Sequence, residues 1–412
     1  MASCNIERHQ NDINEAVEYT DALAEEFAKQ AGVDPRPMET FEEIDETGAF
    51  IRQPNAFIQP AGEGEGHWKA EPGRYQIYWA QGCHWSNRPV IVRDLLGLQD
   101  VISDIKTSHS GQTNKYGHGF ADQPGFADPK TGAHFLSEFY KRADPNFKGR
   151  ATTPTLVDII EKKAVNNDYH RLTNYIEVQF RPFQPADAPD LYPKQFRKEI
   201  DEFNDWLFPH INNAHYRMAF CQSIEAYNEA FDDFYDSLDK LEERLATNRF
   251  LFGDYVTDSD VRLFVTLARW DTGYYRNIGP TKHRIVDYKN IWGYARELYA
   301  IPAFHKNSDI RKLAVGGPDP KSSKEQALMR DFRSRLAPLI DYEALWADDG
   351  ARRSLSKTPD ELFLRHPAGE TYEDYASEIS STIWNSPNWD DRNPRNGTLS
   401  VDASINPLKG KL

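Results

Sequence analysis

The spacing of apolar residues changes along the chain and divides it into four parts. The first has one acidic helical stretch around residues 14–30 and is otherwise rich in proline. The second alternates short strand-like and helix-like runs, and in the third the apolar residues recur at three- and four-residue steps. We therefore predict an extension (1–72), a mixed α/β domain (73–185), an all-helical domain (186–318) and a polar, partly helical tail (319–412).

The α/β domain has a recognisable order of elements. Alternation over residues 75–79 is typical of a strand, the apolar run 90–98 of a helix and residues 101–105 of a second strand. The remaining predicted elements are a helix near 135–142, a strand over 153–159 that pairs with 164–165, and a helix from a capping Asp168 to about 180. This order is that of a thioredoxin-like domain.

The helical domain contains the clearest helix of the chain. Between Ser223 and Thr247 apolar residues recur every three or four positions, so one face of this helix belongs to a core. Thr257 and Asp260 have the spacing of a capping box, which predicts the start of a second, buried helix. The predicted fold class is α/β plus all-α, with an N-terminal thioredoxin-like domain followed by a helical domain.

Composition and charge exclude several classes of protein. The formal net charge of -15 argues against a basic face for nucleic acid, and no apolar run reaches the ~20 residues that a membrane span needs. Residues 1–10 lack the pattern of a secretory signal, and the three cysteines are odd in number and far apart. We expect a soluble cytoplasmic protein with at least one free thiol.

Cys83 is the strongest candidate for a catalytic residue. It follows the first predicted strand and precedes a helix, and a helix N-terminus favours a thiolate, the nucleophilic form of cysteine. Ser86 replaces the second cysteine of a Cys-x-x-Cys motif, so the thiol would act alone and need a diffusible thiol to release it. The alternative is an inert buried thiol. Polar neighbours on both sides favour the reactive interpretation.

A proline complicates the helix that follows. Pro89 would remove a backbone hydrogen bond from a helix that began at residue 83, so we expect the helix to begin near Ser86 or Asn87. Cys83 would then lie slightly ahead of the helix dipole. Its activation would in that case depend more on Arg88 or His84.

Two other motifs could bind a partner thiol. Thr153-Pro154 stands where thioredoxin-like sites have a cis-proline that presents the preceding backbone to a thiol peptide, and a trans proline at a strand edge fits the sequence about as well. Asn167-Asp168-Tyr169 could hold an amino-acid-like group or simply cap a helix. The irregular spacing of His109, His118 and His134 argues against a metal site.

Collinear stretches of the chain match a known family. The strongest are 73–103, 144–150, 191–213, 241–264 and 287–299, within a match that runs from about residue 48 to 318. In these residues the chain resembles the Xi-class glutathione transferases, or glutathionyl-hydroquinone reductases. Because many segments match in the same order, the resemblance implies the fold class predicted above.

The resemblance implies a dimeric enzyme that reduces glutathionyl-hydroquinones or similar aromatic thioethers. Cys83 would attack the substrate sulfur, free the hydroquinone and keep glutathione as a mixed disulfide, which a second glutathione resolves. Tyr216 and Tyr274 match tyrosines of the family's substrate pocket and would stabilise the departing ring. For glutathione itself, Arg150 and the Thr153-Pro154 backbone match positions that the family uses.

Several positions depart from the family pattern. The family's Cys-Pro-Trp is here Cys83-His84-Trp85, and His118 takes the place of a tryptophan over the glutathione. The Glu-Ser pair for the γ-glutamyl end is Asp168-Tyr169, which keeps a shorter carboxylate and fills the place of a small hydroxyl. The residues expected on the glutathione side are Trp85, His118, Arg150, Thr153, Pro154, Asp168 and Tyr169.

Three hypotheses follow for the function. The first is a reductase or transferase with glutathione as co-substrate, an aromatic thioether or quinol as substrate, no metal and a homodimeric assembly. The second keeps the Cys83 chemistry with another low-molecular-weight thiol. The third is a non-catalytic binding or scaffold protein whose tail is the functional part. The tail exceeds the family's usual end and could lie over the active site or the dimer contact.

Overall fold

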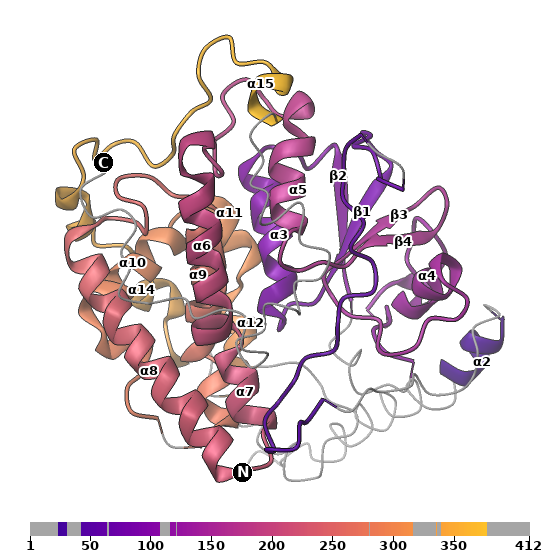
Figure 1. Cartoon of the computed structure of the whole chain (residues 1–412), viewed down its shortest axis with the longest axis horizontal. Helices are drawn as coiled ribbons and strands as arrows, with labels where there is room; N and C mark the ends of the chain where they lie inside the picture. The colour runs from indigo at the N-terminus through magenta and orange to yellow at the C-terminus, as the bar shows by residue number, and fades with distance from the viewer. Residues whose placement is uncertain are drawn as a thin grey trace, which may run out of the picture.

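A four-stranded sheet forms the centre of the α/β domain in the computed structural model (Figure 1). The strands lie in the order β2-β1-β3-β4, with β1 and β2 parallel and the other neighbours antiparallel. Their bounds are Tyr75–Trp79 for β1, Ile102–Lys106 for β2, Thr155–Asp158 for β3 and Lys163–Asn166 for β4. The predicted thioredoxin-like fold is therefore confirmed.

The structure describes most of the chain in several ranges. These are residues 24–30, 43–63, 66–107, 116–120, 122–279, 281–315, 335 and 339–376. Predictions for the first part of the acidic helix, for His109 and for the end of the tail lie outside the described residues. Of the acidic helix, the described part is α2 (Ala24–Gln30).

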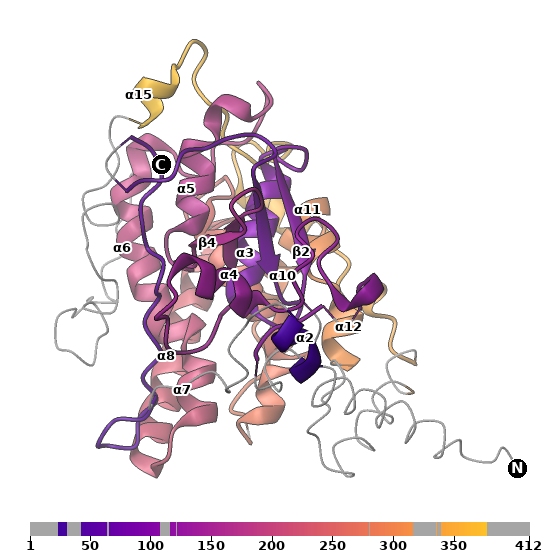
Figure 2. The ribbon, with the colours of Figure 1, turned by 90° about the vertical axis from the view of Figure 1, so that its right-hand side faces the viewer.

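The helices of the α/β domain cover the two faces of the sheet (Figures 1 and 2). Side chains of a strand alternate between its faces, so Ile77 and Trp79 join the core beneath α3 (His84–Leu95) and α5 (Leu172–Gln179). Tyr78 points the other way and packs against α4 (Leu136–Ala143). The strand predicted from the alternation over residues 75–79 is β1.

A bundle of helices follows, and the predicted capping box starts one of them. Ser223 accepts a hydrogen bond from the Ala226 N–H at the start of α8, and Thr257 with Asp260 forms the capping box of α9. The helices are α6 (Arg197–Leu207), α7 (Ala214–Phe220), α8 (Ile224–Thr247), α9 (Asp258–Trp270), α10 (Lys289–Tyr299), α11 (Pro302–Asn307) and α12 (Ile310–Val315).

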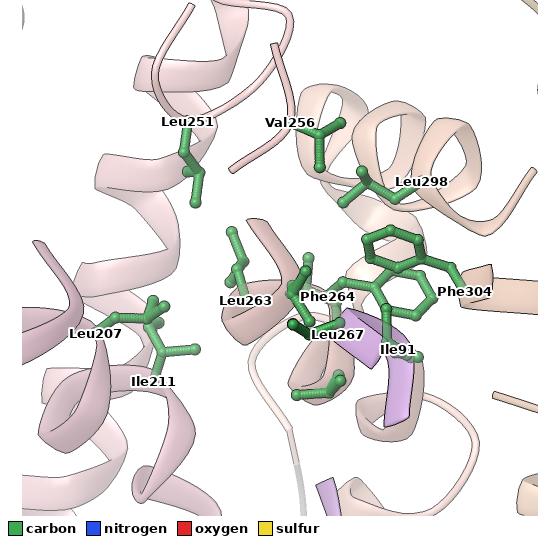
Figure 3. Close-up of a cluster of buried hydrophobic side chains, with 14 of the residues drawn as sticks. Ile91, Leu207, Ile211, Leu251, Val256, Leu263, Phe264, Leu267, Leu298 and Phe304 are labelled. Atoms are coloured by element: carbon green, nitrogen blue, oxygen red, sulfur yellow. The ribbon is translucent and has the colours of Figure 1, made fainter. Parts of the chain in front are cut away.

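Helix α9 packs against α3 of the α/β domain and against helices of the bundle, and every one of its residues is buried. It therefore joins the two parts. Figure 3 shows Phe264 of α9 between Ile91 of α3 and Phe304 of α11. The rings of Phe264 and Phe304 meet edge to face, with centroids 4.9 Å apart. Helix α3 is thereby enclosed by the sheet on one side and by the bundle on the other.

The described end of the tail docks away from the start of α3. Tyr372, in α15 (Tyr372–Ala376), donates a hydrogen bond to Gln179 at the C-terminal end of α5 (Figure 1). Arg352 donates to three backbone carbonyls at the C-terminal end of α8. Tyr372 and Arg352 therefore lie at the far ends of α5 and α8, while the two positions suggested for the tail, over the active site or at the dimer contact, stay predictions.

Trp346 anchors this tail in the helical bundle. Its side chain is 2% exposed and meets the rings of Trp292 and Tyr299 at centroid distances of 4.7 and 5.2 Å. The neighbouring Leu345 is 45% exposed. Leu345 is the last residue of α14 (Tyr342–Leu345), and Trp346 is its C-cap. The two adjacent residues, one exposed and one buried, therefore offer a matched pair of variants.

We predict that Trp346→Ala lowers the free energy of unfolding by about 3–5 kcal/mol, because it leaves a large cavity between aromatic rings. Urea denaturation followed by circular dichroism measures the change. The control Leu345→Ala should stay within about 0.5 kcal/mol of the parent. Equal stabilities of the two variants would contradict this packing account of the tail.

Candidate functional site

A strand, a tight turn and a helix position Cys83. The residue is the N-cap of α3, with extended backbone angles of φ -87 and ψ 112. Ser86 holds the turn together: its Oγ accepts from the Ala80 N–H at 3.0 Å and lies 3.1 Å from the Cys83 carbonyl oxygen. The serine in the place of a second cysteine therefore has a structural role.

The helix begins earlier than Pro89 predicted. The Asn87 N–H already donates to the Cys83 carbonyl at 3.2 Å, so α3 starts at His84 and Pro89 lies inside it. Pro89 removes the bond to the carbonyl of Trp85, but burial of the helix along most of its length stabilises the turn. The expectation of a start near Ser86 or Asn87 is wrong, and Cys83 lies at the helix terminus.

The Cys83 thiol faces the cis-proline turn. The peptide bond between Thr153 and Pro154 is cis, which decides between the two alternatives left open by the sequence. Cys83 Sγ lies 3.6 Å from the Thr153 carbonyl oxygen and can donate to it. Thr153 Oγ1 is buried and has no hydrogen-bond partner among the described residues. The turn therefore keeps polar atoms beside the sulfur.

Aromatic rings enclose the other side of the thiol. Cys83, Trp85 and Tyr169 form one buried cluster against which Phe208 and Tyr216 pack. The Trp85 ring lies 4.9 Å from Tyr169, 5.4 Å from Phe208 and 6.1 Å from Tyr216 between centroids. A flat aromatic ligand would find matching faces here.

His84 lies fully buried behind this cluster. Its Nδ1 is 3.1 Å from Thr266 Oγ1, and its ring is flanked by Tyr216 and Tyr274, each at a centroid distance of 5.5 Å. Burial, together with nearby arginines, holds the pKa of His84 well below its usual value. The imidazole is therefore neutral near pH 7, and the expectation that its charge helps Cys83 is not supported.

The two predicted pocket tyrosines lie together. Tyr274 donates to the Gly82 carbonyl at 3.4 Å, and its ring stacks on His215 with a centroid distance of 3.9 Å. Burial and the proximity of Cys83 raise the pKa of Tyr216 to about 12, and burial raises that of Tyr274 well above its usual value. Both phenols keep their protons near neutral pH and can donate them.

Three guanidinium groups surround the site without a carboxylate partner. Arg52, Arg88 and Arg269 make no ion pair with any residue that the structure describes. Arg88 donates to Asn212 Oδ1 at 2.6 Å, and burial lowers its pKa to about 9. The field of these cations favours an anion at the site.

Arg150 is engaged by the extension. Its Nη2 donates to both carboxylate oxygens of Glu43 at 2.6 Å, and its backbone N–H donates to Gln53 Oε1 at 2.9 Å. His118 lies nearby, buried, with Nδ1 3.1 Å from Thr107 Oγ1, and burial with the charge of Arg150 lowers its pKa to about 4. Among the described residues, no hydrogen bond or ring contact joins either side chain to Cys83.

Asp168 is buried rather than open to a ligand. Its Oδ2 lies 3.3 Å from Arg171 Nε, and its Oδ1 accepts from the His170 N–H at 3.1 Å. Burial raises its pKa, while Arg171 opposes the rise. The regular helix α5 begins at Leu172, later than predicted, but the Leu172 N–H donates to the Asp168 carbonyl at 2.9 Å. Asp168 therefore caps the turn that leads into α5, as the sequence suggested.

The extension supplies residues that sequence reasoning did not select. Arg52 lies over the rings of Tyr216 and Trp85, and Glu43 pairs with Arg150. Neither belongs to a motif, because each contact joins residues far apart in the sequence.

The described residues contain neither a candidate metal centre nor a membrane-spanning helix. No group of three or more histidine, cysteine, aspartate or glutamate side chains there could hold a metal ion. Within the same part of the chain, no helix combines the length and the apolar character that crossing a bilayer requires.

The comparisons with known proteins agree in one family. Residues 224–297 match the model of the glutathione S-transferase C-terminal domain. The glutathionyl-hydroquinone reductase PcpF of Sphingobium chlorophenolicum is 36% identical over 248 residues, which are 59% of this chain and 76% of that protein. The reductase YqjG of Escherichia coli K12 is 35% identical over 264 residues, or 62% of this chain and 80% of its own.

A solved structure supports the same assignment. The Xi glutathione S-transferase from Phanerochaete chrysosporium superposes with a TM-score of 0.61 at 32% identity, covering 67% of this chain and 90% of its own. PcpF and YqjG are each more than 30% identical to this chain, and the matches cover three quarters or more of their length. The match therefore includes both the α/β and the helical domain. The chain belongs to the family of glutathione-dependent enzymes that comprises the Xi-class glutathione transferases and the glutathionyl-hydroquinone reductases.

Proposed function

We propose that this enzyme reduces glutathionyl-hydroquinones and similar aromatic thioethers, with Cys83 as the nucleophile. The observation that carries the proposal is the position of Cys83 at the N-cap of α3, with its sulfur between the Thr153 carbonyl and an aromatic cluster. A helix N-terminus stabilises negative charge, and the rings accept a flat substrate. The relatives named as glutathionyl-hydroquinone reductases support the same reaction.

The reaction balances with one further glutathione. The Cys83 thiolate attacks the thioether sulfur, a sulfur–sulfur bond forms, and the carbon–sulfur bond breaks. Its electron pair stays on the aromatic carbon, which takes up a proton and leaves as the hydroquinone. A second glutathione thiolate then attacks the glutathione sulfur of the mixed disulfide, which gives glutathione disulfide and restores the Cys83 thiolate. The substrate carbon is reduced, and two glutathione sulfurs are oxidised.

Tyr216 and Tyr274 have the protonation state that the first step needs. Their raised pKa values keep both phenols protonated, so they can hydrogen-bond the substrate's oxygen or supply the proton to the ring. Arg88 and Arg269, which no described carboxylate neutralises, add positive potential where charge develops. In this proposal the two tyrosines act as proton donors, and the two arginines stabilise the developing negative charge.

Glutathione would lie along the cis-proline turn, on the side of Cys83 opposite the aromatic cluster. The backbone of Thr153 and the guanidinium of Arg150 are the groups that fit its peptide and a carboxylate. Asp168 is held by Arg171, and Tyr169 fills the space beside Trp85. These two occupied positions favour a second candidate, the same Cys83 chemistry with a low-molecular-weight thiol that lacks a γ-glutamyl group.

We predict that Cys83→Ser lowers kcat/KM for a glutathionyl-hydroquinone at least ~10³-fold, since the hydroxyl cannot replace the thiolate. Release of the hydroquinone, followed by chromatography, measures the rate. Cys221→Ser is the matched control, because that thiol is bonded to the Met218 carbonyl and lies outside the aromatic cluster. A Cys83→Ser protein that is folded by circular dichroism and keeps full activity would overturn the mechanism.

We predict that Glu43→Gln lowers the KM for glutathione by about 2- to 5-fold, the range of a partly exposed ion pair. The Glu43 carboxylate engages Arg150, so a glutathione carboxylate must displace it. Initial rates at varied glutathione concentration test this. Glu46→Gln, an exposed change on the same segment, should leave KM unchanged. A KM that rises or stays constant in Glu43→Gln would remove Arg150 from the glutathione site.

A further inference from the structure

Arg52 of the extension reaches into the site from outside both domains. Its guanidinium carbon lies 4.4 Å from the ring centroid of Tyr216, 5.0 Å from that of Trp85 and 5.8 Å from that of Tyr169. These rings are the ones that pack around Cys83. A cation from an N-terminal segment therefore forms part of the aromatic wall beside the thiol.

The charge of Arg52 has no partner in the described part of the chain. Its Nε and Nη2 both donate to one neutral acceptor, Asn213 Oδ1, at 3.2 and 2.9 Å. Its Nη1 has no acceptor among the described residues, and the side chain is only half-buried. The guanidinium thus keeps a donor edge that can meet a ligand.

Two further arginines lie near the thiol. Arg88 and Arg269 form no ion pair with a carboxylate that the structure describes, and His215, beside Tyr216, is kept neutral by burial and by Arg52 itself, which lower its pKa to about 3. The whole chain carries a net charge of -15, so this positive pocket lies within an acidic molecule. A local cationic site in such a field attracts small anions selectively.

The position of Arg52 distinguishes two halves of the substrate. Thr153 and Arg150, which fit glutathione, lie along the cis-proline turn, whereas Arg52 lies over Trp85 and Tyr169 and closest to Tyr216, the tyrosine assigned to the aromatic half. An anionic group bound by Arg52 would therefore belong to the aromatic half. The same guanidinium could stack on the substrate's ring while its edge donates to that group.

We infer that Arg52 is a specificity-determining residue that binds a carboxylate on the aromatic half of the substrate. The inference rests on the proposed reaction at Cys83. It names the preferred substrate class as glutathionyl conjugates of hydroquinones that carry an acidic substituent. The competing explanation is a structural one, in which Arg52 only ties the extension to α7 through Asn213.

Two conjugates of matched shape test this inference. One is the glutathionyl conjugate of 2,5-dihydroxybenzoate, and the other is that of unsubstituted hydroquinone. In Arg52→Met, the ratio of kcat/KM for the acidic conjugate to that for the neutral one should fall ~10-fold or more, the size of one lost charge-assisted hydrogen bond, mainly through KM. Arg52→Lys should keep part of the preference. Arg353→Met, a change of an exposed arginine in the tail, should keep both rates.

Three outcomes would overturn the inference. An equal fall for both conjugates in Arg52→Met would indicate the structural tie. A rise for both would mean that Arg52 obstructs the pocket. An unchanged ratio would mean that Arg52 does not contact the acidic substituent.

Binding to the Cys83→Ser protein separates this inference from the reaction itself. Calorimetric titration of both conjugates, with Arg52 intact and as Arg52→Met, measures the same preference without turnover. If the parent protein turns over neither conjugate while the Arg52-dependent preference in affinity persists, the proposed reaction fails and the anion site stands. If turnover occurs without a charge preference, the reaction stands and the anion site fails.

Discussion

The enclosure of α3 between the sheet and the helical bundle is the constraint on which the rest of the structure depends. Burial on both sides fixes the helix in spite of Pro89 and so fixes its first residue. Cys83, as the N-cap, then has one possible position, at the end of β1 and opposite the Thr153 carbonyl. The reactive geometry follows from the core of the fold rather than from a mobile loop.

The extension places side chains near Cys83 that neither domain supplies. Arg52 adds a cation to the aromatic side of the thiol, and Glu43 adds an acid to the glutathione side. Gln53 and Asn55 add hydrogen bonds to Arg150 and Asp168, at 2.9 and 3.5 Å. Under the proposed function, this one segment would contact both halves of the substrate site.

The sequence predicted what local chemistry determines. Alternation predicted β1, apolar periodicity predicted α8, and the capping box predicted the start of α9. The position of Cys83 between a strand and a helix singled it out as a candidate. It failed where tertiary packing overrides local preference, as at Pro89. Asp168 caps the turn before α5 as its local features suggest, but its buried pairing with Arg171 was not predicted. The contacts of Arg52 and Glu43 join distant segments, so no local pattern could predict them.

The most direct test of the account is the intermediate on Cys83. The protein is mixed with a glutathionyl-hydroquinone in the absence of free glutathione, and intact-protein and peptide mass spectrometry follow. The account predicts one glutathionyl group on the peptide of Cys83, removable by added glutathione, together with an equal amount of free hydroquinone. Retention of the whole aromatic conjugate, or a glutathionyl group on Cys221 with Cys83 unmodified, would contradict it.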